Sequence, residues 1–294
     1  MNDRPEPCAK PYRSALYLPA SNQRAIEKAR GLPVDVVILD LEDAVAPQAK
    51  GEARLAAVAA VAAGGFRAGT LVLRVNGLDT PWGTDDLAAA AELDIAAVLV
   101  PKICDAHDIG RYDAALHHAR PGVALWAMVE TCRAVSQLQP IADRSADTRL
   151  SGLVMGCNDL LLEMRAHAMP ARANLMPVLT LAVAAARSQR LVVFDGVCND
   201  FTDIAAFQAE AAQGLALGFD GKSLIHPAQI DPCNAVFSPS AEEVARARGV
   251  VQAFAHPDNE GKGAIRLDGR MVERLHLAEA ARLLAIAEAI GTPG

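Results

Sequence analysis

The chain has 294 residues and a net charge of −7, with 52% hydrophobic but only 4% aromatic residues. The acidic balance argues against a general nucleic-acid-binding protein, which would need a basic face. None of the six cysteines forms a CxxC pair, so we expect reduced thiols and neither a zinc site nor a disulfide framework. No apolar run reaches the roughly 18 residues of a membrane span, and no apolar leader precedes Tyr12, so we expect a cytoplasmic protein.

Eight short apolar runs recur along the chain, and most of them are followed by a charged residue. In chain order they are residues 15–18, 36–39, 71–73, 97–100, 125–129, 152–155, 191–194 and 219–225. Helices are predicted between them, with one starting at Asp105 and the others over residues 22–30, 47–63, 134–143, 173–190 and 201–217. Ser21 is the expected N-cap of the first helix, and residues 160–173 are expected to form an irregular loop.

Strand, charged end and helix, repeated eight times, predict an α/β fold of the (β/α)8 TIM-barrel type. The low aromatic content agrees with this, because buried parallel strands are built mainly from aliphatic residues. In such a barrel the carboxyl ends of all strands meet at one mouth, so residues far apart in the sequence can share a site. Functional residues are therefore expected at the carboxyl ends of the strands.

The composition changes near Pro232, where the predicted barrel ends. We expect a catalytic barrel domain over residues 1–235, which includes a short N-terminal arm, and a C-terminal helical extension over residues 236–294. Within the extension, helices are predicted over residues 241–255 and 271–290, and the glycine-bearing segment over residues 256–270 is expected to be a hinge between barrel and tail.

Glu130 and Asp159 follow the fifth and sixth predicted strands. Adjacent strands lie roughly 5 Å apart, so both carboxylates can reach one cation. Two carboxylates that leave the other positions to water and substrate oxygens are typical of a Mg²⁺ site. The alternative is that each carboxylate only caps the helix that follows it.

Arg74 ends the third strand, where a guanidinium could bind a substrate carboxylate with two parallel hydrogen bonds. The alternative is an ion pair with Asp40 or Glu42 from the second strand, and both interpretations can hold together. Asp40, Glu42 and Asp43 place three acids within four residues. One of them could hold a metal-bound water or orient Arg74 or Lys102, or they could form a structural ion-pair layer.

Lys102, after the fourth strand, could form a Schiff base, but a salt-bridged structural role is favoured. His226, after the eighth run, could be an acid or base or could cap the end of the barrel. Arg13, Arg24 and Lys28 cluster around the first strand and its helix, where they could meet the phosphates of a nucleotide-like group. For Lys28, a solvated helix face is the default interpretation.

Seven segments together resemble the motifs of the citrate lyase β-subunit-like family, in the order in which that family has them. This family includes malyl-CoA and citramalyl-CoA lyases and lies within the wider HpcH/HpaI aldolase group. The resemblance extends over roughly residues 12–290. The segments are residues 13–21, 39–45, 73–76, 101–102, 128–131, 156–160 and 218–227.

The resemblance implies a barrel in which residues matching Glu130 and Asp159 hold Mg²⁺, with Glu130 also next to the substrate. It implies that the arginine matching Arg74 binds the carboxylate of a keto acid. Acyl-CoA or an acyl-carrier thioester would lie along the mouth, with its phosphates near the basic first helix. Members of the family are commonly trimers or hexamers, in which the C-terminal segment reaches over the site of a neighbouring subunit.

The chain departs from the family at the C-terminal acid/base. The CoA-lyase members have an aspartate there, whereas this chain has Glu273 after Gly269-Arg270-Met271-Val272. A glutamate keeps the carboxylate but extends its reach by one methylene, and a misplacement of about 1 Å can cost on the order of 10²-fold in rate.

The predicted function is a Mg²⁺-dependent carbon–carbon lyase that converts a short β-hydroxyacyl thioester into a 2-keto acid and an acetyl thioester. Glu273, Asp40 and Glu42 are the candidate catalytic carboxylates. One alternative is a metal-dependent aldolase of free hydroxy-keto acids. In the family resembled, that branch typically has a histidine near the metal on the second strand. The second strand of this chain has no histidine, so this alternative is disfavoured. Another is a weakly catalytic subunit that binds keto acids or an acyl carrier, which the replacement at Glu273 suggests.

Overall fold

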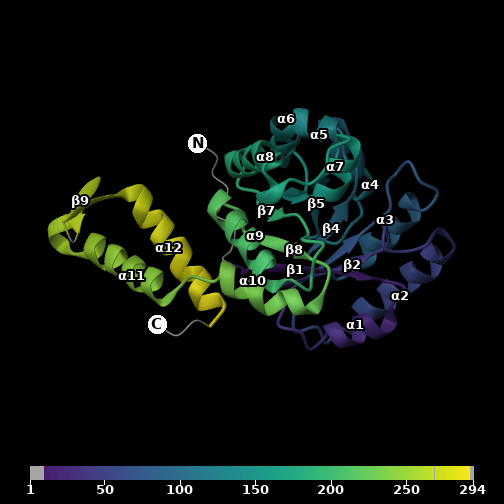
Figure 1. Cartoon of the computed structure of the whole chain (residues 1–294), viewed down its shortest axis with the longest axis horizontal. Coiled ribbons are helices and arrows are strands. Elements are labelled where there is room, and N and C mark those ends of the chain that lie inside the picture. Colours follow the sequence, from purple (N-terminus) through teal and green to yellow (C-terminus); the bar gives the residue numbers. More distant parts are fainter. Residues whose placement is uncertain (1–9, 268, 292–294) are drawn as a thin grey trace. The chain divides into compact units, whose positions relative to one another are not determined.

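The computed structural model describes residues 10–267 and 269–291 of the chain. Eight parallel strands close into a barrel in sequence order, with β8 pairing with β1 (Figure 1). This confirms the predicted (β/α)8 TIM barrel. The strands are β1 Ser14–Pro19, β2 Val36–Asp40, β3 Thr70–Arg74, β4 Ala97–Val100, β5 Ala124–Val129, β6 Leu150–Met155, β7 Val192–Asp195 and β8 Gly221–Leu224.

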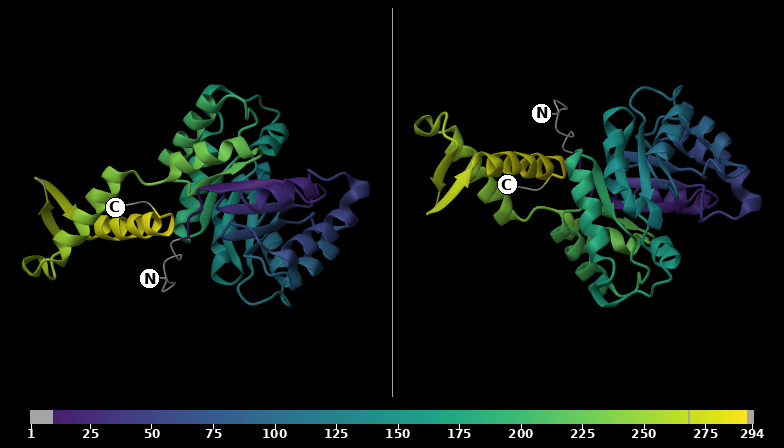
Figure 2. Two further views of the ribbon diagram at one scale, coloured as in Figure 1. Left: turned by 90° about the horizontal axis from the view of Figure 1, so that it is seen from below. Right: turned by 90° about the horizontal axis from the view of Figure 1, so that it is seen from above.

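Helices connect the strands and surround the barrel (Figure 2). Two local predictions are wrong. Asn22, not Ser21, caps the first helix, because its side chain accepts a hydrogen bond from the Ala25 N–H. Part of the expected loop is the helix α7, which directly follows β6 and buries Leu160 in the core. The helices are α1 Gln23–Ala29, α2 Lys50–Ala63, α3 Gly83–Glu92, α4 Ala106–Ala115, α5 Cys132–Ser136, α6 Leu138–Asp143, α7 Cys157–Glu163, α8 Met176–Ser188, α9 Ile204–Leu217 and α10 Ile230–Phe237, with 3₁₀ turns η1 Pro47–Ala49, η2 Arg144–Ala146, η3 Pro170–Arg172 and η4 Pro227–Gln229.

The strands contribute to two apolar layers, because successive residues of an extended chain point to opposite faces. Inward-facing residues such as Ile38, Leu99 and Val154 form a cluster inside the barrel. The residues between them, such as Val37 and Leu153, pack against the surrounding helices. Because both layers are apolar, the strands are nearly continuous hydrophobic runs in the sequence.

Three aromatic rings fill the interior near the beginning of β1. The ring centroid of Tyr12 lies 6.0 Å from that of Trp126 and 5.9 Å from that of Phe194. A β-carbon at Gly152 would lie 2.8 Å from the Trp126 ring, so glycine is needed there. The interior is thus a packed core, and a site can form only at the carboxyl ends of the strands.

Tyr12–Phe237 form one compact unit, and the chain from Ser238 onward belongs to a second unit. In the second unit two helices pack together through residues that include Ala247, Val250 and Ala280. An antiparallel hairpin joins them, so the prediction that the last helix begins at residue 271 is wrong. Residues 1–9 of the predicted N-terminal arm lie outside the described residues. The elements are α11 Ala241–Ala255, η5 Pro257–Asn259, β9 Ala264–Leu267, β10 Arg270–Glu273 and α12 Arg274–Ala289.

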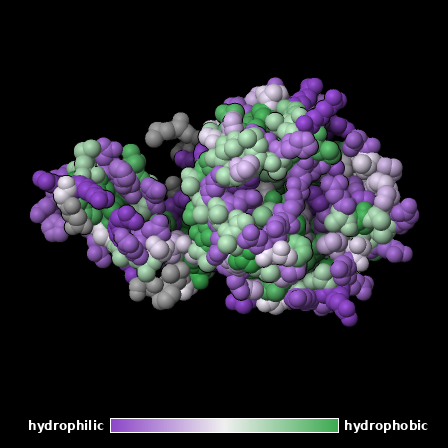
Figure 3. Space-filling view, in the orientation of Figure 1, coloured by the Kyte–Doolittle hydropathy of each residue, from purple (hydrophilic) through white to green (hydrophobic). Residues whose placement is uncertain are grey.

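Polar and apolar residues are mixed over the face that Figure 3 shows. Large apolar side chains remain exposed on several segments, among them Leu162, Met169 and Phe201. Of the helices in the described part of the chain, none is long and apolar enough to cross a membrane.

Candidate active site at the barrel mouth

Three charged side chains continue the inward-facing rows of the barrel at its carboxyl end. Asp40 ends β2, Arg74 ends β3, and Glu130 directly follows β5. Each comes two residues after a member of the interior apolar cluster, so each points to the inside of the barrel. All three are buried, with exposed fractions of 0%, 8% and 1%. The two-residue period therefore brings an arginine and two carboxylates to one mouth.

A bidentate ion pair orients Arg74. Its Nε and Nη2 donate to the two carboxylate oxygens of Asp40 over 2.6 Å each. The same carboxylate also accepts the N–H groups of Glu42 and Ala44, at 2.8 and 3.3 Å. Both oxygens of Asp40 are thus occupied, and these contacts fit the predicted alternative in which Asp40 orients Arg74. Nη1 of Arg74 points elsewhere, 3.1 Å from Glu42 Oε2.

Lys102 is held by the acids that follow β2. Its Nζ donates to Glu42 Oε1 over 2.6 Å and to Asp43 Oδ1 over 3.2 Å. Burial alone would lower the pKa of Lys102, but these two carboxylates raise it above its ordinary value. A Schiff base needs a neutral amine, so the salt-bridged role is favoured. Burial raises the pKa of Glu42.

One oxygen of Glu130 has a partner and the other has none. Oε1 accepts the Lys102 backbone N–H over 2.7 Å. Oε2 is buried and has no hydrogen-bond partner among the described residues. Burial, together with the negative charge of Asp159, raises the pKa of Glu130 to about 8. A β-carbon at Gly156 would collide with Glu130 Oε2, so the backbone approaches this oxygen as closely as glycine allows.

These features fit a hard divalent cation. An unpartnered buried carboxylate oxygen beside a second carboxylate is costly unless a positive charge joins them. Asp159, in the first turn of α7, is half-buried and supplies that second carboxylate. No group of three or more His, Cys, Asp or Glu side chains suited to a metal occurs among residues 10–267 and 269–291. Glu130 and Asp159 would thus leave several positions to water and substrate oxygens, as Mg²⁺ prefers.

The three predicted phosphate-binding residues do not lie together. Arg13 precedes β1, at the end of the strand opposite the mouth. There it forms a bidentate pair with Asp35, with Nε and Nη2 each 2.8 Å from a carboxylate oxygen. Arg24 and Lys28 are exposed on α1. Only α1 can therefore bring predicted basic residues toward a ligand at the mouth.

His226 and Glu273 each cap a helix. The Nδ1 of His226 accepts the Ala228 N–H at the start of η4, and its ring stacks on Phe201 with centroids 4.5 Å apart. This is the capping role predicted as the alternative to catalysis. Glu273 ends β10 in the second unit and is the N-cap residue of α12, where its backbone N–H donates to His276 Nδ1 over 2.9 Å.

Sequence reasoning missed two residues of the mouth. Tyr17 of β1 places its ring under Arg74, with the centroid 4.8 Å from Cζ, and burial raises the pKa of its hydroxyl. The strand alternation could have identified it. Lys50 of α2 is buried, and its Nζ donates to the carbonyl oxygens of Leu41 and Glu42 at 2.9 and 2.7 Å. No sequence signal identifies a helical lysine that reaches the end of a strand.

Two charged strand residues face away from the mouth. Asp195 of β7 is next to an inward-facing residue, so its side chain points outward. It accepts Lys222 Nζ at 2.9 Å and Arg172 Nη1 at 2.7 Å, and Lys222 also donates to Glu210 of α9 at 2.7 Å. This buried cluster of ion pairs joins the barrel to its helices and has a structural role.

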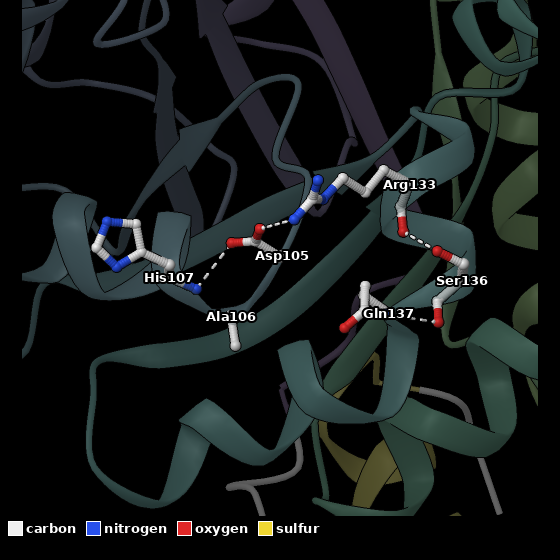
Figure 4. A pocket seen from close by; sticks show the side chains of 6 residues that line it. All are labelled: Asp105, Ala106, His107, Arg133, Ser136 and Gln137. Atoms are coloured by element: carbon white, nitrogen blue, oxygen red, sulfur yellow. Dashed lines mark hydrogen bonds and ion pairs between the residues drawn. The ribbon is translucent and has the colours of Figure 1, made fainter.

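A polar pocket of about 470 Å³ lies between the start of α4 and α5 (Figure 4). Arg133 Nη2 donates to Asp105 across it over 2.8 Å, and Asp105 caps α4 by accepting the His107 N–H over 3.0 Å. The residues that line it follow β4 and β5. They are Asp105, Ala106, His107, Arg133, Ser136 and Gln137.

Two curated relatives resemble the chain over nearly its whole length. It is 44% identical to the (3S)-malyl-CoA thioesterase of Cereibacter sphaeroides strain KD131, over 96% of both chains. It is 34% identical to citrate lyase subunit beta of Escherichia coli K12, over 95% of this chain and 94% of the relative.

A solved relative shows the same architecture. It is the protein CitE from Mycobacterium tuberculosis in complex with magnesium, acetoacetate and coenzyme A, which is 29% identical with a TM-score of 0.74. The match covers 94% of this chain and 97% of that chain. The family described as HpcH/HpaI aldolase/citrate lyase matches residues 13–227. As the resemblance predicts, the chain belongs to the HpcH/HpaI aldolase/citrate lyase family, which includes enzymes.

Proposed function

We propose that the chain is a magnesium-dependent enzyme that acts on a short 3-hydroxyacyl thioester of the malyl-CoA type. The observation that carries the proposal is the unpartnered, buried Oε2 of Glu130 at the mouth that also holds the oriented Arg74. The solved relative in complex with magnesium and coenzyme A supports this ligand class. So does the relative named a malyl-CoA thioesterase.

Each residue of the mouth has a role in this proposal. Glu130 and Asp159 would hold Mg²⁺, which supplies Lewis-acid stabilisation of an oxygen on which negative charge develops. Arg74 binds the substrate carboxylate through the part of its guanidinium that Asp40 leaves free. Asp40 keeps that guanidinium in place, so the carboxylate is bound in one orientation. Arg24 of α1 would meet the phosphates of the thioester carrier.

Carbon–carbon cleavage is the reaction that the motifs predict. A base removes the proton of the 3-hydroxyl group, and the bond between that carbon and its neighbour breaks. The products are a 2-keto acid and an acetyl thioester, whose methyl carbon takes up a proton. Glu42, whose pKa burial raises, is the carboxylate of the barrel suited to this proton transfer. Glu273 is the other candidate, supplied by a neighbouring subunit of a homo-oligomer.

Hydrolysis of the thioester is the second candidate, and two observations favour it. The chain is more similar to the malyl-CoA thioesterase than to the citrate lyase subunit, at 44% against 34% identity. In addition, Glu273 replaces the aspartate that the lyases use. In hydrolysis, water adds to the thioester carbonyl, the carbon–sulfur bond breaks, and the thiol leaves with a proton.

One assay separates the two reactions. The purified chain is incubated with Mg²⁺ and malyl-CoA, citramalyl-CoA or citryl-CoA, and both keto acid and free thiol are measured. Keto acid without thiol shows cleavage, and thiol without keto acid shows hydrolysis. Loss of either product with EDTA and in Glu130→Gln supports the metal site.

Two added measurements, turnover of a free hydroxy-keto acid and thermal stability with ligands, test the remaining alternatives. Turnover of a free hydroxy-keto acid without any thioester would make the chain an aldolase. Thermal stabilisation by Mg²⁺ plus glyoxylate, with no turnover of any thioester, would make it a binding subunit. Full activity in EDTA would overturn the proposal.

A further inference from the structure

We infer that Lys102 is a positioning residue. Its backbone N–H orients the proposed metal ligand Glu130, and its side chain holds Glu42 back from Arg74, the proposed carboxylate-binding residue. The inference deepens the proposed function and rests on it. It starts from two contacts that the residue makes at the same time. The Lys102 N–H donates to Glu130 Oε1 over 2.7 Å, and Nζ donates to Glu42 Oε1 over 2.6 Å.

The backbone contact depends on a conformation that lysine rarely adopts. Lys102 has φ of 50°, in the left-handed region. Such a conformation is strained for any residue other than glycine, and strain of this kind is concentrated at functional sites. Lys102 holds this left-handed conformation at the same position where its N–H donates to Glu130 Oε1. The other oxygen, Oε2, is thereby presented without a partner, as a metal ligand requires.

The side-chain contact controls a competition for Arg74. Glu42 Oε2 lies 3.1 Å from Arg74 Nη1 but does not form a hydrogen bond with it. Nη1 belongs to the part of the guanidinium that Asp40 leaves free. A substrate carboxylate must therefore compete with Glu42 for it. By holding Oε1, the ammonium of Lys102 prevents Glu42 from turning fully onto Arg74.

Two substitutions separate the two contacts. Lys102→Gly keeps the left-handed backbone and its N–H but removes the ammonium, whereas Lys102→Val also disfavours the backbone conformation. Binding of Mn²⁺ alone is followed through the EPR signal of the free ion. Binding of glyoxylate at saturating Mg²⁺ is followed by calorimetry.

We expect Lys102→Val to bind Mn²⁺ about 10–100-fold more weakly, as when a residue that orients a metal ligand is lost. Lys102→Gly should bind Mn²⁺ like the wild type but glyoxylate about tenfold more weakly, the scale of one charged hydrogen bond. Adding Glu42→Gln to Lys102→Gly should restore glyoxylate binding, because the competing negative charge is gone. A purely structural lysine would give no such rescue.

Arg190→Val is the matched control, because Arg190 also has a left-handed φ, of 57°, and lies just before β7, away from the mouth. It should show the cost in thermal stability without any change in Mn²⁺ binding. Wild-type protein that binds no Mn²⁺ would refute the proposed function itself. Wild-type binding with equal affinity in Lys102→Val, equal loss in both Lys102 variants, or no rescue by Glu42→Gln would refute the inference.

Discussion

Glu130→Gln should make the metal-free protein more stable while abolishing its response to metal. Burial raises the pKa of Glu130 from its ordinary 4.5 to about 8. The folded state then keeps a proton that the unfolded chain releases between pH 4.5 and 8, so stability contributed by this group falls as pH rises through that window. At about 1.4 kcal/mol per pKa unit, the cost is about 3 kcal/mol at pH 7 and about 5 kcal/mol well above pH 8.

The neutral amide of the variant avoids this cost. Urea unfolding in EDTA should therefore show a stability difference in favour of Glu130→Gln that is near zero at pH 4.5 and grows toward pH 8. Mg²⁺ at 100 times its dissociation constant should stabilise the wild type by about 2.7 kcal/mol and leave the variant unchanged. Glu92→Gln, on an exposed position of α3, is the control and should show neither effect.

Two results would refute this reasoning. A stability difference that does not depend on pH would show that the Glu130 carboxylate carries no cost of burial. Equal stabilisation of wild type and variant by Mg²⁺ would show that the cation binds elsewhere.

Three further predictions follow from other contacts. Gly156→Ala, which pushes a methyl group against Glu130, should weaken Mn²⁺ binding in the EPR titration, and unchanged affinity would contradict the close approach. Lys222→Met should lower stability to urea by about 3–5 kcal/mol, because Asp195 stays buried with one cationic partner fewer, whereas a loss below about 1 kcal/mol would contradict this. Pyruvate with borohydride should leave Lys102 unmodified in mass spectrometry, because its raised pKa keeps the amine protonated, and an adduct would restore the Schiff-base alternative.

Much of the architecture could be predicted because each strand is buried on both faces. A strand of this kind must be an apolar run, so eight runs were visible without any knowledge of their contacts. The family resemblance, which the comparisons confirm, came from the charged residues that end these runs. The hairpin that ends at Glu273 was not predicted, because the glycines of that segment indicate a turn or a hinge equally well.

The composition of the mouth follows from the sequence, since the parallel topology and the ends of the strands place Arg74 and Glu130 there. Their working geometry was decided by contacts between residues far apart in the chain. Both carboxylate oxygens of Asp40 accept hydrogen bonds from Arg74. Arg13 forms a bidentate ion pair with Asp35 at the opposite end of the barrel. A strand pattern tells which residues reach the mouth. Which oxygen of a carboxylate stays free is decided by partners brought in from other strands, and only the closed barrel defines these.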